Sequence, residues 1–207
     1  MTQTSPNFAD TDSLTDTDKL ARHFRDAMRS VAEVSVLDGE CKQWEVRTWR
    51  QVHSRSAQIA KQLLDDASSA ATGPARPGAL GLIGDPTIDL IAAIQGAFLA
   101  GVAVSILPGP VRGADRDRWA ETTYERFVGV GVTTVLGGGT ELAQLSEIDG
   151  TLRVTDARTY GVDADAADFE PVTASPEDPA ILQGTAGSTG EPKTAVISRA
   201  AALTNAV

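Results

Sequence analysis

The sequence contains few cysteine, histidine and basic residues. Cys41 is the only cysteine among 207 residues, so no disulfide can form within the chain. Histidine occurs only as His23 and His53, which leaves no Cys and His cluster for a structural metal ion. The 18 Lys and Arg residues are outnumbered by 28 Asp and Glu, and the formal net charge of -10 argues against a nucleic-acid-binding surface. These absences favour a cytoplasmic protein.

The sequence also lacks the apolar segments of exported or membrane proteins. Residues 1–19 are polar and acidic, without the basic start and apolar core of a signal peptide, so we expect a disordered lead. The stretch Leu90–Leu107 is the most apolar, but Gln95, Gly101 and Ser105 interrupt it. We therefore predict a buried helix that runs into a buried strand, and no membrane span.

Apolar periodicity alternates between strand and helix along the chain. This alternation predicts an α/β fold in which helices cover both faces of a sheet. Asp38-Gly39 favours a tight hairpin turn, and residues 137–139 (GGG) favour a plain strand-to-helix turn because the GxGxxG pattern is not met. We expect the acidic stretch 161–179 to be a solvated loop. The predicted strands are 34–37, 44–47, 80–83, 102–107, 132–136, 152–154, 180–183 and 194–197, and the predicted helices are 49–65, 86–101, 115–128, 140–147 and 200–207.

The most distinctive segment is GTAGSTGEPKTAVIS, residues 184–198. Two of its glycines lack the Cβ that keeps a backbone from closing on a ligand, so their N–H groups can form an anion-binding nest. Three hydroxyl side chains add donors and a lysine adds a mobile positive charge. Hydrogen bonds to a charged group contribute roughly 1.5–3 kcal/mol each, so the segment predicts a phosphate-binding loop, with ATP as its ligand. The candidate binding residues are Thr185, Gly187, Ser188, Thr189, Gly190 and Lys193.

Two better-known loops fit these residues poorly. A Walker loop needs its lysine directly after a glycine, whereas Lys193 comes three places after Gly190. A nucleophile elbow needs GxSxG, whereas Ala186 occupies the first glycine position and neither histidine lies downstream of Ser188. Three alternatives stay open: a hairpin without a ligand, a non-catalytic nucleotide-binding or interaction module, and a serine hydrolase that uses Ser188.

The loop resembles the [ST]SG[ST][ST]GxPKG signature of the adenylate-forming enzymes, which include acyl-CoA synthetases, peptide-synthetase adenylation domains and fatty acyl-AMP ligases. Ala186, Thr194 and Arg199 depart from it, because serine, glycine and a histidine are usual at these positions. The matching positions are Thr185, Gly187, Ser188, Thr189, Gly190, Pro192 and Lys193.

Two upstream segments extend the resemblance over nearly the whole chain from about residue 31. Residues 48–52 (TWRQV) resemble an early T-[YW]-x-x-[LV] element that opens a helix. Residues 97–108 are similar to an LxAGxxxxPL element in which Gly101 would close the helix. From residue 84 to residue 113 the chain is most similar to the fatty acyl-AMP ligases of mycobactin siderophore assembly.

The resemblance implies the activity of a longer enzyme. Such an enzyme activates a fatty acid with ATP and Mg²⁺ and transfers the acyl group from acyl-AMP to an acyl carrier protein, here in siderophore lipid-tail assembly. The fold implied is the N-terminal part of the adenylate-forming fold, with a mostly parallel sheet. We expect residues 20–207 to be an incomplete N-terminal subdomain of an adenylation domain that ends just after the phosphate-binding loop. It would hold no catalytic residue and no metal ligand, and would be inactive alone.

Overall fold

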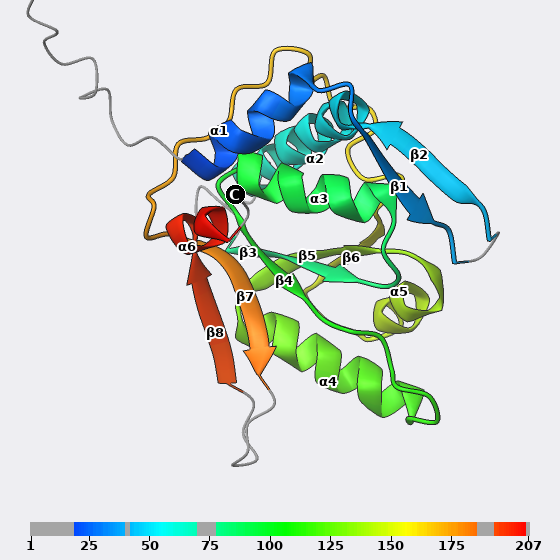
Figure 1. Cartoon of the computed structure of the whole chain (residues 1–207). Helices are drawn as coiled ribbons and strands as arrows, with labels where there is room; N and C mark the ends of the chain where they lie inside the picture. Colours follow the sequence, from blue (N-terminus) through cyan, green and yellow to red (C-terminus); the bar gives the residue numbers. More distant parts are fainter. Residues whose placement is uncertain (1–18, 40–41, 70–77, 186–192, 206–207) are drawn as a thin grey trace, which may run out of the picture.

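The computed structural model describes residues 19–39, 42–69, 78–185 and 193–205 (Figure 1). These residues form a central sheet, helices on its two faces and a separate two-stranded hairpin. In chain order the elements are α1 (Lys19–Asp26), the 3-10 helix η1 (Ala27–Arg29), β1 (Glu33–Leu37), β2 (Trp44–Thr48), α2 (Trp49–Ser69), β3 (Ala79–Ile83), α3 (Ile88–Leu99), β4 (Ala103–Ile106), α4 (Arg116–Gly129), β5 (Val132–Gly137), α5 (Gly139–Ser146), β6 (Arg153–Asp156), β7 (Pro179–Thr185), β8 (Lys193–Ser198) and α6 (Arg199–Thr204).

The central sheet has six strands in the order β6-β5-β3-β4-β7-β8. The first five are parallel to one another, and β8 is antiparallel to β7. β3 lies inside the sheet, and all five of its residues, ALGLI, are buried. A strand that is covered on both faces needs such a continuous apolar run. The α/β fold with a mostly parallel sheet is therefore confirmed.

Helices cover both faces of this sheet, as Figure 1 shows. Helices α1, α2 and α3 lie on one face, where Ile59 and Leu63 of α2 pack with Phe98 of α3 in one core. Helices α4 and α5 lie on the other face, where Phe127 and Leu145 form a second core with the strands. The prediction that helices cover both faces of the sheet is confirmed.

Helix α3 has well-defined ends. It begins at Ile88 rather than at Pro86, because the Thr87 Oγ1 accepts a hydrogen bond from the Leu90 N–H at 3.1 Å. Gly101, with φ 71°, closes the helix as predicted, and the Val102 N–H donates to the Ala97 carbonyl at 2.8 Å. The apolar stretch is thus a buried helix followed by a buried strand. Among the described helices, none combines the length and the apolar character that crossing a bilayer requires.

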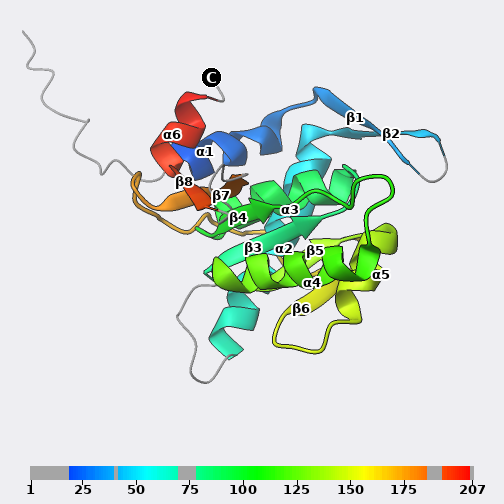
Figure 2. The same ribbon diagram turned by 90° about the horizontal axis from the view of Figure 1, so that it is seen from below.

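The β1–β2 hairpin has a longer connection than predicted. Leu37 pairs with Trp44, so the connection spans residues 38–43 and a tight turn at Asp38-Gly39 is wrong. Lys42 takes the left-handed conformation in this connection, with φ 55°. Figures 1 and 2 show the hairpin extending away from the sheet.

Helix α1 was not predicted. It begins at Lys19, the last residue of the expected lead, while residues 1–18 lie outside the described part of the chain. Leu20 is buried, and the Phe24 ring lies 5.5 Å from the Phe98 ring of α3. The helix therefore belongs to the core on this face, and the helical spacing of Leu20, Ala21 and Phe24 is a sequence signal that could have predicted it.

The acidic stretch between β6 and β7 is only partly a solvated loop. Five of its acidic residues are exposed, as predicted, whereas Asp178 is half-buried and accepts a hydrogen bond from the Ser175 N–H at 2.9 Å. However, Ala174 is buried, Phe169 packs against the core, and the Val172 N–H donates to the Leu99 carbonyl at 2.8 Å. This hydrogen bond satisfies a carbonyl at the C-terminal end of α3, so the stretch is tied to the helix it crosses.

Candidate functional site

The predicted phosphate-binding segment is held by an antiparallel hairpin. β7 and β8 pair from Pro179 opposite Ser198 to Thr185 opposite Lys193. The predicted strand on each side of the loop is confirmed, and each is longer than predicted. The last pair brings the two ends of the loop together, which is the geometry that a closed anion-binding turn needs.

The structure describes only part of the predicted site. Lys193 is the first residue of β8 and is exposed. Thr185 ends β7, and its backbone pairs with that of Lys193. The other four candidates, Gly187, Ser188, Thr189 and Gly190, lie outside the described residues. Their part in phosphate binding stays a prediction.

The hairpin diverges from the rest of the sheet. β7 pairs with β4 at a single position, Val104 opposite Ile181, whereas it pairs with β8 over most of its length. Figure 1 shows the hairpin turning down from the sheet toward α4. Because β7 runs parallel to β4, the loop leaves the sheet at the same carboxyl edge at which β3, β4 and β5 end.

A cavity of about 290 Å³ lies between this hairpin and α4. One wall is a single face of α4, from which Glu125 and Arg126 line the cavity. The hairpin forms the opposite wall and includes Lys193. Leu107, after β4, and Leu182 of β7 add apolar surface. Glu125 and Arg126 were not predicted, because only the course of the hairpin brings α4 near Lys193.

The glycine triplet after β5 is a packing feature. Gly138 precedes α5 and Gly139 begins it with φ 69°. A Cβ on Gly84, which follows β3, would lie 3.1 Å from the Gly138 carbonyl oxygen, so two backbone turns approach closely here. The predicted plain strand-to-helix turn is confirmed.

Arg199, one departure from the family signature, has a structural contact. Its side chain is buried at the start of α6, 1% exposed, and its Nη2 donates to the Phe98 carbonyl at 2.7 Å. The guanidinium carbon lies 5.9 Å from the centre of the Phe98 ring. The contact satisfies a carbonyl at the C-terminal end of α3 and brings a cation to the negative end of the helix dipole.

A larger cavity of about 570 Å³ lies beside α2. Arg25, Arg50 and His53 line it together with three acidic residues of the stretch after β6. Burial lowers the pKa of His53, and the nearby Arg25 lowers it further, against a backbone hydrogen bond with Phe24 that raises it. His53 is therefore neutral at pH 7, and two cations face three carboxylates. This balance does not favour a polyphosphate, so the smaller cavity is the better candidate.

The described residues contain no group of three His, Cys, Asp or Glu side chains that could hold a metal ion.

The sequence profile of the family described as AMP-binding enzyme matches residues 22–207. The chain belongs to the AMP-binding enzyme family. The hairpin and its cavity lie inside the matched region.

Solved structures contain the same fold. The chain is similar to a structure from work on the fatty acyl-adenylate ligases from E. coli and L. pneumophila, with a TM-score of 0.72 and 21% identity over 90% of this chain and 33% of that chain. It is also similar to the fatty acyl-adenylate ligase from L. pneumophila in complex with acyl adenylate and pyrophosphate, with a TM-score of 0.69 and 20% identity over 91% and 31% of the two chains. The Brucella canis acyl-CoA synthetase gives a TM-score of 0.68 and 17% identity over 89% and 34%. The chain thus spans about a third of the length of these structures.

Proposed function

We propose that residues 20–207 are the incomplete N-terminal subdomain of a longer fatty acyl-AMP ligase. The longer enzyme joins a fatty carboxylate to the AMP part of MgATP and then passes the acyl group to an acyl carrier protein. Family membership over residues 22–207 and the fold shared with fatty acyl-adenylate ligases support this proposal.

One observation carries the proposal. The pairing of β7 with β8 places Thr185 opposite Lys193, at the two ends of the signature segment. The family profile matches residues 22–207, which include this segment. Gly187, Ser188, Thr189 and Gly190 lie between these ends in the sequence. We propose that these four residues bind the β- and γ-phosphates of ATP, because backbone N–H groups and hydroxyls are neutral donors that suit a polyanion.

The proposed reaction has two steps. A carboxylate oxygen of the fatty acid attacks the α-phosphorus of MgATP, and the bond to the β-phosphate bridging oxygen breaks with release of pyrophosphate. Lys193 and the loop donors offset the negative charge that collects on the departing pyrophosphate. The nucleophile of the carrier protein then attacks the acyl carbon, and AMP leaves. Residues outside this chain supply the contacts to adenine and ribose.

The finer role rests on the sequence resemblance. Residues 84–113 are similar to the fatty acyl-AMP ligases of mycobactin assembly, so we propose a long-chain fatty acid for a siderophore lipid tail as the substrate. A cytoplasmic location accords with this role, because ATP and carrier proteins are available there.

Pyrophosphate exchange by the intact protein tests the proposal. We expect exchange of labelled pyrophosphate into ATP that depends on a fatty acid, measured over a panel of chain lengths. In the Lys193→Ala variant, exchange should fall roughly ten- to hundredfold, since about 1.5–3 kcal/mol of charge-assisted hydrogen bonding is lost. Lys61→Ala is the matched control, because Lys61 is a lysine of α2 whose side chain is 40% exposed and pairs only with Asp65 among its described carboxylate neighbours.

Three outcomes are informative. Nucleotide binding without exchange for any fatty acid would favour the non-catalytic module instead. Hydrolysis of an ester without ATP would favour a serine hydrolase. Full exchange activity in Lys193→Ala would remove this lysine from the mechanism while leaving the ligase assignment intact.

A further inference from the structure

We infer that Arg126 of α4 is a second cationic contact for the nucleotide phosphates, acting from the wall opposite Lys193. The inference rests on the proposed function, because it takes MgATP as the ligand of the hairpin site. It adds a residue that lies 67 positions before Lys193 in the sequence (193 - 126) and outside the signature segment.

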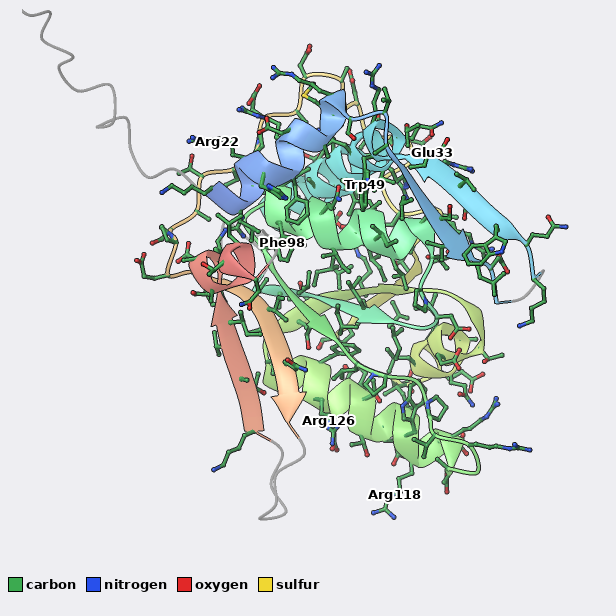
Figure 3. The ribbon with its side chains drawn as sticks, in the orientation of Figure 1. Arg22, Glu33, Trp49, Phe98, Arg118 and Arg126 are labelled. Atoms are coloured by element: carbon green, nitrogen blue, oxygen red, sulfur yellow. The ribbon has the colours of Figure 1, made fainter. Side chains whose placement is uncertain are left out.

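Position is the first argument. Arg126 and Lys193 line the same cavity of about 290 Å³, one from α4 and one from the β7–β8 hairpin. Figure 3 shows Arg126 beside the end of β7, whereas Arg118 of the same helix projects away from the fold. The cavity therefore has one basic residue on each of its two walls.

Charge is the second argument. Among the described residues, the Arg126 guanidinium forms no ion pair, whereas Arg55 and Arg153 are each paired with an aspartate. Glu125 also lines the cavity, and it forms no ion pair with Arg126 in this part of the chain. The formal charges of the three charged residues that line the cavity, Glu125, Arg126 and Lys193, add to +1, and a positive lining attracts an anion.

Chemistry is the third argument. A guanidinium presents a planar set of N–H donors that can bind two phosphate oxygens at once, whereas an ammonium acts as a point charge. Arg126 is exposed, so it is accessible to a ligand and its substitution leaves the core of α4 intact. Its i+1 neighbour Phe127 is fully buried and holds the helix against the sheet. The arginine thus projects from a fixed support.

The test measures MgATP affinity in the intact protein by calorimetry and KM in pyrophosphate exchange, at constant ionic strength because salt screens these charges. Arg126→Gln should weaken MgATP binding roughly ten- to hundredfold, and Arg126→Lys should weaken it less. Glu125→Gln should act in the opposite direction and strengthen binding about two- to fivefold, because it removes a negative charge from the same wall. Arg118→Gln is the matched control and should leave affinity unchanged.

The inference and the proposed function fail in different ways. If the unmodified protein forms acyl-adenylate but Arg126→Gln binds MgATP with unchanged affinity, Arg126 has no contact with the phosphates and the proposed function stands. If the unmodified protein neither binds MgATP nor exchanges pyrophosphate, both are wrong. Thermal unfolding of each variant should match the unmodified protein, and equal loss of affinity in Arg126→Lys, Arg126→Gln and Arg118→Gln would indicate a structural effect and overturn the inference.

Discussion

At the scale of single residues, a few arginines hold separate segments together by satisfying backbone carbonyls. Arg55 of α2 donates to Asp89 at 3.0 Å, to the Ala157 carbonyl at 2.8 Å and to the Tyr160 carbonyl at 2.7 Å. Its side chain is only 15% exposed. One guanidinium therefore joins α2, α3 and the segment after β6.

We expect Arg55→Met to lower the free energy of unfolding by about 2–4 kcal/mol, because it leaves a carboxylate and two carbonyls without this donor. Urea unfolding measures the change. Arg158→Met is the control, since the Arg158 side chain is 65% exposed and pairs with Asp156 two positions away. Its effect should stay below about 1 kcal/mol, and an equally small effect at Arg55 would contradict this role.

Asp66 at the end of α2 is a pH-sensitive contact. Burial opposes its ionisation, but hydrogen bonds from Tyr160, Arg153 and Gln62 together hold its pKa below the ordinary range. A lowered folded-state pKa stabilises the protein above the unfolded value of about 3.9, and this stability is lost as pH falls through the folded pKa.

We therefore expect acid to weaken the native state below about pH 4 in part through Asp66. Tyr160→Phe removes one donor, the hydroxyl that lies 2.8 Å from the Asp66 carboxylate. It should raise the Asp66 pKa and move the loss of stability to higher pH. Carboxyl NMR titration with pH-dependent unfolding tests this, and a Tyr160→Phe titration curve that superimposes on the unmodified one would contradict it.

At the scale of elements, close packing of α2 against α3 depends on a glycine. A Cβ on Gly96 would lie 2.8 Å from the Ser56 carbonyl oxygen and 3.0 Å from the Ile59 side chain. Backbone cannot give way as a flexible side chain does, so the two helices would have to separate.

Gly96→Ala should destabilise the protein by about 1–3 kcal/mol in urea unfolding, despite the higher helix propensity of alanine. Gly129→Ala is the matched control, because a Cβ there meets nothing within 4 Å in the described structure. This control should be neutral or stabilise α4 by up to about 1 kcal/mol. Equal effects of the two substitutions would remove the packing explanation.

Much of the fold could be predicted from sequence because its signals are local. The apolar run of β3 and the capping glycine of α3 needed no tertiary information. Residues whose role depends on distant partners could not be predicted: Arg199 contacts the carbonyl and the ring of Phe98, 101 positions away in the sequence. The candidate site divides in the same way. Lys193 was predicted from its motif, whereas Arg126 could be proposed only from the course of the hairpin.

At the scale of the whole molecule, the chain spans about a third of the length of the solved structures it matches. Several apolar side chains around the hairpin and α4 are exposed, including Val196 at 60% and Val128 at 45%. Such side chains mark surface that further protein could cover.

We expect a protein of residues 1–207 alone to give no acyl-adenylate, because the proposed adenine and ribose contacts lie outside it. The measurement is pyrophosphate exchange with a fatty acid, run beside the intact protein, and with circular dichroism to check folding. Acyl-adenylate formation by the folded short chain would show that these residues hold the whole nucleotide site.

The single point of pairing between β7 and β4 has a consequence for engineering. Val104 and Ile181 form the joint, and beyond them the hairpin shares no ladder with the parallel strands. We therefore expect that a loop of different length or sequence can be placed between β7 and β8 without a change in the register of β3, β4 and β5.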